Sequence, residues 1–264
     1  MCLILLAHRM HRHYPLVLAA NRDEQYSRPT ATAAFWSDHP EIYGGRDLEK
    51  GGTWLGITRS GRIAAVTNFR DAFAPKTSTR SRGELVSDFL SGGEPAPTYT
   101  ARLLAEAHTY NGFNLIAGDR NQLCYVSNHC DEVRTLAPGI YGLSNHLLDT
   151  PWPKVQRGKQ VVAELLEHTE RELIEGLFGL LADRMPAPDH VLPHTGVGLP
   201  RERVLSPAFI LSPTYGTRSS SVILVGHDEQ VVYSERNFGP HGESGTAGTA
   251  RFMLEPAAPN SVAA

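Results

Sequence analysis

Cys2, the second residue of the chain, has a side chain suited to nucleophilic chemistry. Methionine aminopeptidases remove Met1 when the next residue is small, and cysteine qualifies. The new terminus would hold a thiol beside an α-amino group whose ordinary pKa is about 8. Because that amine can accept a proton near neutral pH, Cys2 is a candidate nucleophile activated by its own terminus. The alternative is a small buried residue that starts an edge strand.

Four consecutive polar residues follow an apolar run that would pair with the Cys2 strand: Asn21, Arg22, Asp23 and Glu24. Asp23 could accept a hydrogen bond from the amino group and orient it. Arg22 could lower the pKa of the thiol, because a nearby cation favours the thiolate. The alternative interpretation is an Asx turn with a surface ion pair.

Two asparagines and a second arginine also stand at strand ends. Asn68 ends one apolar run, Asn145 follows another, and Arg218 precedes a third. A side-chain amide offers N–H donors without a charge to neutralise, so Asn68 and Asn145 are candidate oxyanion donors. Arg218 could face the same pocket. Each asparagine could equally be an ordinary turn residue.

Composition argues against several classes of function. The 264 residues carry a formal net charge of −3, which disfavours a broad basic surface and nucleic acid as a partner. No apolar run approaches the roughly 20 residues of a membrane-spanning helix, and no signal-peptide pattern is present, so we expect a cytoplasmic protein. The three cysteines imply no disulfide framework, and the spacing of Cys124 and Cys130 fits no zinc site, so no metal centre is predicted.

Apolar periodicity predicts an α+β protein. It predicts strands over 2–7, 15–20, 53–58, 62–69, 113–117, 122–127, 140–143, 208–211, 220–225 and 231–235. Helical spacing is found over 82–90, 98–110, 153–168 and 171–182. Because hairpins take the place of βαβ units, we expect antiparallel sheets flanked by helices. No linker divides the chain, which predicts one domain over 1–255 and a flexible tail over 256–264.

Several spaced motifs resemble one known family. The string LAANRDE at 18–24, with YSRP at 26–29 after it, resembles the motif that names the NRDE family, the family of transport and Golgi organization protein 2. Further matches follow in order along the chain: GGTWLG at 51–56, YNGFNL at 110–115, GLSN at 142–145, TPW at 150–152 and YGTR at 215–218. Together they cover most of the chain, so it is identified as a member of this family.

A more distant resemblance implies a fold and a mechanism. Five residues look like the ordered active-site residues of penicillin V acylases and bile salt hydrolases: Cys2, Asp23, Asn68, Asn145 and Arg218. Those enzymes are N-terminal nucleophile hydrolases with an αββα sandwich of two stacked, mainly antiparallel sheets. The resemblance implies cleavage of a linear amide or thioester without a cofactor.

The resemblance also implies a role for each residue. Cys2 would attack, its amine would carry the proton, the two asparagines would hold the oxyanion, and Asp23 and Arg218 would position the centre. The acylases have an arginine three residues before the aspartate, where this chain has Ala20. We expect Arg22, the available substitute, to lie on the opposite face of the extended strand.

A non-catalytic carrier or chaperone is the second hypothesis. The NRDE resemblance implies links to haem trafficking and to acyl-CoA or lipid metabolism, so haem or acyl-CoA would be a bound ligand. The candidate binding residues are Asn21, Arg22, Glu24, His11 and His13. The histidines could supply an axial ligand to haem or contact an acidic headgroup, although a solvated hairpin loop explains the same composition. A scaffold for secretory traffic is a third possibility that no motif supports.

Overall fold

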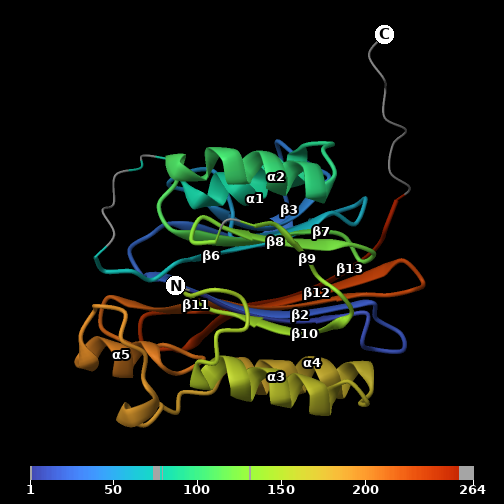
Figure 1. Ribbon diagram of the computed structural model, residues 1–264. Coiled ribbons are helices and arrows are strands. Elements are labelled where there is room, and N and C mark those ends of the chain that lie inside the picture. Colours follow the sequence, from blue (N-terminus) through green and yellow to red (C-terminus); the bar gives the residue numbers. More distant parts are fainter. Residues whose placement is uncertain (1, 74–77, 79, 131, 256–264) are drawn as a thin grey trace.

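Two antiparallel sheets stack face to face in the computed structural model, which describes residues 2–73, 78, 80–130 and 132–255 (Figure 1). Within these residues, one sheet has six strands in the order β10 (Gly139–Leu143), β1 (Cys2–His8), β2 (Leu16–Gln25), β11 (Tyr215–Val225), β12 (Gln230–Phe238), β13 (Ser244–Met253). The other has seven in the order β3 (Thr30–Phe35), β4 (Ile42–Asp47), β5 (Leu55–Thr58), β6 (Ile63–Asn68), β7 (Phe113–Gly118), β8 (Leu123–Ser127), β9 (Arg134–Thr135).

Helices cover the outer face of each sheet (Figure 1). α1 (Arg82–Ser91) and α2 (Ala96–Glu106) pack on the seven-stranded sheet, and α3 (Pro153–Leu165) and α4 (Glu170–Leu181) pack on the six-stranded sheet. The short helix α5 (Leu199–Leu205) lies beside the α3 layer at one end of the sandwich. The layers are therefore α, β, β and α, and the predicted αββα sandwich is confirmed.

The core has three apolar layers, which fix the direction of each side chain on β1. Ile4 and Leu6 belong to the layer between the two sheets, whereas Leu3 and Leu5 belong to the layer under α3 and α4. Side chains alternate along a strand. Cys2 therefore continues the row that faces the opposite sheet.

Several stretches differ from the sequence prediction. The residues 21–24 lie inside β2, so the Asx-turn alternative is wrong. Strands β3, β4 and β13 were missed because their small and polar residues show little apolar alternation. The predicted strand over 208–211 is wrong, because only Leu211 forms an isolated bridge there.

Two further predictions concern the ends of the chain and the membrane. The tail predicted over 256–264 lies outside the described residues. Among the helices that the structure describes, none is both long and apolar enough to cross a membrane.

Candidate active site

Three strand ends meet around Cys2 in the six-stranded sheet. Cys2 lies directly opposite Arg22 on β2, and two residues further along β1, Ile4 lies opposite Leu143 on β10. Just after β10, Ser144 donates a hydrogen bond from its Oγ to the backbone carbonyl of Cys2 at 3.2 Å. The sheet register therefore brings the start of the chain beside residues more than a hundred positions away.

The surroundings of Cys2 raise the pKa of its thiol above the ordinary value. The residue is partly buried, and burial is the largest influence that raises the pKa of the thiol. The charge of Asp23 raises it further, whereas the Asp23 backbone and the Arg22 charge lower it. Because only the thiolate is an effective nucleophile, a base must remove the proton before attack.

Arg22 lies on the same face of β2 as Ala20, so the expectation that it would lie on the opposite face is wrong. The two residues are two positions apart, and Ala20 belongs to the layer between the sheets. The guanidinium carbon of Arg22 lies 4.1 Å from the centre of the Trp54 ring, and Nη1 donates to Thr30 Oγ1 at 2.8 Å. This buried cation is thus the cross-strand neighbour of Cys2.

Asp23 is buried and held by β11. Its Oδ1 accepts a hydrogen bond from Thr217 Oγ1 at 2.7 Å, and its backbone carbonyl accepts one from the Tyr215 hydroxyl at 2.8 Å. Burial raises the pKa of Asp23, while the charges of Lys154 and Arg70 and the Thr217 hydrogen bond lower it. A buried carboxyl in this setting is poised to interact with an amino group.

Lys154 is a buried neighbour of Asp23 that sequence reasoning missed. Its Nζ donates to the backbone carbonyls of Leu205 at 2.9 Å and Pro207 at 3.4 Å. Burial lowers the pKa of Lys154 to about 8, with the charge of Asp23 acting in the opposite direction. Nothing in the sequence distinguishes this lysine from other lysines at the start of a helix.

The two candidate oxyanion asparagines come together from different sheets. Asn145 Nδ2 donates to the backbone carbonyl of Asn68 at 3.0 Å, and Asn145 Oδ1 accepts from Arg70 Nη2 at 3.4 Å. An amide nitrogen has a second N–H, which is the donor that an oxyanion would need. Arg70, also missed, forms a buried ion pair with Glu202 of α5 at 2.6 Å.

Two more arginines border this region. Arg218 sits where the β2–β11 register shifts, and its Nη1 donates to the backbone carbonyls of residues Gln25, Tyr26 and Arg28. It therefore fixes the turn after β2. Arg82, at the start of α1, has a pKa lowered by burial and raised by the charges of Glu24 and Cys2, which makes it an electrostatic neighbour of the thiol.

The remaining candidate binding residues occupy other positions. Asn21 faces the helix layer, where Nδ2 donates to the carbonyls of Leu181 and Ala208, each at 2.8 Å, and Oδ1 accepts from Ser220. Its hydrogen-bonding groups thus hold the sheet to its helices. Glu24 accepts a hydrogen bond from the backbone N–H of Gln25 at 2.8 Å.

The histidine-rich turn lies at the far end of β1 from Cys2. The seven-residue strand places the two ends roughly 20 Å apart. His11 Nδ1 accepts hydrogen bonds from the backbone N–H groups of His13 at 3.0 Å and Tyr14 at 3.1 Å. The structure does not bring His11 or His13 to the Cys2 site. Among the described residues, no three or more His, Cys, Asp or Glu side chains form a group that could hold a metal ion.

Comparison with known proteins identifies the family. The model of Transport and Golgi organisation 2 matches residues 1–240. The Bos taurus transport and Golgi organization protein 2 homolog is 41% identical over 240 residues, which are 85% of this chain and 87% of that protein. The Homo sapiens homolog is 39% identical over 242 residues, with the same coverage of both chains. The chain belongs to the Transport and Golgi organisation 2 family.

Other members and solved structures extend the comparison. Transport and Golgi organization protein 2 of Drosophila melanogaster is 31% identical over 258 residues, covering 87% of this chain and 89% of that one. A crystal structure of the mutant C2A of conjugated bile acid hydrolase from Clostridium perfringens aligns with a TM-score of 0.50 at 10% identity, covering 100% of both chains. This likeness shows that the chain shares its fold with that hydrolase.

A Caenorhabditis elegans N-acylethanolamine-hydrolyzing acid amidase ortholog also aligns, with a TM-score of 0.47 at 11% identity over 84% of this chain and 92% of that one. In the chain itself, the NRDE string at 21–24 lies on β2, the strand that pairs with the Cys2 strand.

Proposed function

We propose that this member of the Transport and Golgi organisation 2 family is an N-terminal cysteine hydrolase that cleaves a linear amide or thioester. The observation that carries the proposal is the register of β1 and β2, which sets Cys2 opposite Arg22 and beside the buried Asp23. A nucleophile, a cation and a carboxyl at one strand end are the parts that self-activated cysteine chemistry requires.

The first step would be proton transfer within Cys2 after removal of Met1. The α-amino group takes the thiol proton, and the sulfur attacks the carbonyl carbon of the substrate to form a tetrahedral oxyanion. Because burial raises the pKa of the thiol, this internal base is needed at neutral pH. Asp23, held by Thr217, is the residue that would orient the resulting ammonium.

The following steps would release the two products. The second N–H of Asn145 Nδ2 would stabilise the oxyanion, and the ammonium would protonate the departing amine or thiol. A water molecule would then attack the thioester to Cys2, returning the acid product and the free thiol. Every proton moves through the amino group of Cys2, so the cycle needs no cofactor.

A carrier of haem or acyl-CoA is the alternative function. A pocket of about 150 Å³ beside Arg22 and Arg218 could hold an acidic group of such a ligand, but it is smaller than a whole haem or acyl-CoA. For haem, His11 would need to rearrange, because its Nε2 is buried and has no hydrogen-bond partner among the described residues. A carrier would bind without turnover and would not depend on the thiol of Cys2.

The deciding experiment combines mass spectrometry with substitution of Cys2. Intact-mass measurement first establishes that Met1 has been removed. Cys2→Ser and Cys2→Ala should then each reduce amide or thioester cleavage by roughly 10³-fold or more, with the fold preserved. Cys130→Ser is the matched control, since it removes a partly buried thiol from the loop after β8. Full cleavage by Cys2→Ala would contradict the hydrolase.

A further inference from the structure

Four residues form a row across the six-stranded sheet. Cys2 lies opposite Arg22, Arg22 lies opposite Ser219 of β11, and Ser219 lies opposite Asn237 of β12. Directly opposed residues of antiparallel strands point to the same face. The row therefore runs from the candidate nucleophile along a single face of the sheet.

A pocket of about 150 Å³ lies over the far part of this row. Arg22, Ser219 and Asn237 line it together with Thr30, Thr32, Arg218 and Phe238. Six of these seven side chains are polar, and two are guanidinium groups. The lining is therefore rich in hydrogen-bond donors and in positive charge.

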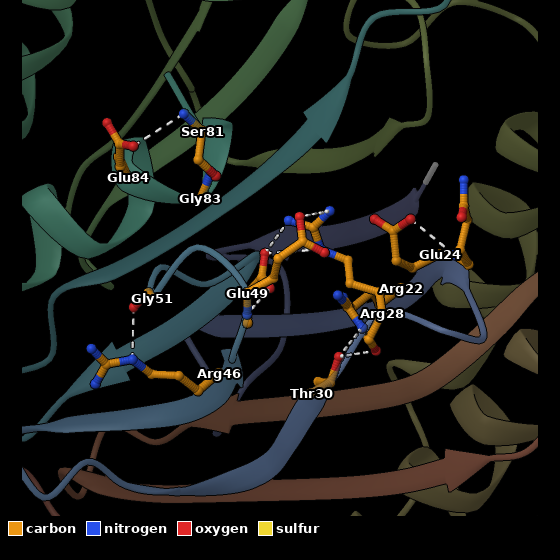
Figure 2. A network of polar contacts seen from close by, with 12 residues as sticks. Arg22, Glu24, Arg28, Thr30, Arg46, Glu49, Gly51, Ser81, Gly83 and Glu84 are labelled. Atoms are coloured by element: carbon orange, nitrogen blue, oxygen red, sulfur yellow. Dashed lines mark hydrogen bonds and ion pairs between the residues drawn. The ribbon is translucent and has the colours of Figure 1, made fainter. Parts of the chain in front are cut away.

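Both guanidinium groups lack a carboxylate partner. In the described part of the chain, neither Arg22 nor Arg218 forms an ion pair; Arg22 Nη1 donates to Thr30. The nearby Arg28, by contrast, is paired with Asp47 at 2.6 Å and with Glu49 at 3.6 Å. Figure 2 shows the two neighbouring arginines with these different partners. The charges of Glu24 and Asp47 raise the pKa of Arg22, but neither carboxylate forms an ion pair with it among the described residues, and Asp47 is paired with Arg28. The burial of this cation is therefore only partly compensated, and an anionic ligand would compensate it further.

Ser219 provides an independent observation. The residue is 3% exposed, and its Oγ has no hydrogen-bond partner among the described residues. Buried polar groups in native proteins nearly always have a partner. Ser219 lines the pocket, but its Oγ is closed off from a water-sized group there, so a ligand oxygen would reach it only after a small rotation of the side chain.

The acidic groups near the pocket are already engaged. Glu235 Oε1 accepts hydrogen bonds from the backbone N–H of Ala33 at 2.8 Å and from Asn237 Nδ2 at 3.1 Å, and its Oε2 accepts from Ser221. Glu24 accepts from a backbone N–H. Among the described residues, neither Glu235 nor Glu24 forms an ion pair with Arg22 or Arg218.

We propose that this pocket binds an oxyanion group of the substrate, either a carboxylate or a phosphate. Ser219 lies two strands from Cys2, a separation of roughly 10 Å. The substrate would therefore carry its negative charge roughly six to eight bonds from the scissile carbonyl. Anion binding by this pocket does not depend on the proposed hydrolase function. Only the distance from the anion to a scissile carbonyl rests on that proposed function.

Binding can be tested without turnover by placing a carboxylate in the pocket. Ser219→Asp should melt roughly 2–4 °C higher than the neutral Ser219→Asn, because the new carboxylate pairs with Arg22 and Arg218. Adipate or inorganic phosphate should raise the melting temperature of the unmodified protein above that in sodium chloride of equal ionic strength. Neither probe should protect Ser219→Asp. The more protective probe identifies the oxyanion.

Equal melting temperatures of Ser219→Asp and Ser219→Asn, with no protection of the unmodified protein by either probe, would contradict anion binding by the pocket. Arg46→Gln is the matched control, because Arg46 also stacks on an indole ring, Trp36 at 4.0 Å, but is already paired with Asp38. That variant should keep the full response to both probes.

Thioesters of dicarboxylic acids of increasing length test the spacing. At the optimal chain length, the thioester with a free distal carboxylate should have a kcat/KM about 10-fold or more above that of the same thioester with this carboxylate methylated. Ser219→Asp should abolish this preference. Cleavage without any anion preference overturns the pocket and leaves the hydrolase standing. Protection by a probe without any cleavage overturns the hydrolase and leaves the pocket standing.

Discussion

Asn145 Nδ2 donates a hydrogen bond to the backbone carbonyl of Asn68 at 3.0 Å and so joins the two sheets at the candidate site. Asn68 ends β6 of one sheet, and Asn145 follows β10 of the other. A second bond beside it, from Thr67 Oγ1 to the carbonyl of Ser144 at 2.6 Å, makes the same connection. The proposed oxyanion donor is thus positioned by the stacking of the sheets.

Asn145→Ala should lower both activity and stability. Removal of the amide leaves the Asn68 carbonyl without this donor, at a cost of about 1–3 kcal/mol in the free energy of unfolding. Loss of an oxyanion donor should reduce kcat about 10²- to 10³-fold. Urea unfolding and steady-state kinetics measure the two effects. A variant with reduced stability and unchanged kcat would exclude Asn145 from the oxyanion site.

Asp23→Asn should change how stability depends on pH. Burial raises the folded-state pKa of Asp23 above the unfolded value of about 3.9, so the folded state binds the proton more tightly. The stabilising contribution of this group is present below pH 4 and is lost as pH rises through the folded pKa. Relative to the wild type, Asp23→Asn should therefore gain stability across that window. Urea unfolding at a series of pH values tests this, and a constant difference would contradict it.

Lys154→Met should remove a pH dependence on the alkaline side. The folded-state pKa of Lys154 is about 8, below its ordinary value of 10.5, so its contribution to stability is present above 10.5 and lost as pH falls toward 8. As pH rises from 8 to 10.5, the wild type should gain on the order of 3 kcal/mol in the free energy of unfolding relative to Lys154→Met. Parallel unfolding curves for both proteins measure the difference. If the free energy of unfolding depends on pH in the same way for both proteins, Lys154 is not desolvated.

Gly52→Ala should destabilise the contact between the 51–56 motif and α1. A Cβ at Gly52 would lie 2.5 Å from the backbone carbon of Gly83, so the start of α1 must move. We expect a loss of about 1–3 kcal/mol, and a weaker influence of Arg82 on Cys2. Gly93→Ala is the control, because its Cβ would meet nothing within 4 Å. Unfolding free energies measure the loss of stability, and the pH dependence of the thiol alkylation rate measures the influence of Arg82. An unshifted alkylation profile would mean that Arg82 does not influence the Cys2 thiol.

Local patterns in the sequence were enough for the family and the fold class. The NRDE string, its spaced companion motifs and the hairpin-rich order of strands are properties of short segments, which can be read without knowing what they contact. The same patterns singled out Cys2, Asp23, Asn68 and Asn145. They missed β3, β4 and β13, whose small and polar residues become strands only through pairing with their neighbours.

The tertiary structure decided which residues face one another. Alternation along β2 already puts Arg22 on the face of Ala20, but only the register of β1 and β2 sets it opposite Cys2. Ser219 and Lys154 carried no local signal, since a serine in a strand and a lysine in a helix are common. Their importance comes from long-range register and burial, which place Ser219 opposite Arg22 and Lys154 within reach of the Asp23 charge. Cross-strand pairing between distant segments is a cooperative property of the whole sandwich, and no short stretch of sequence encodes it.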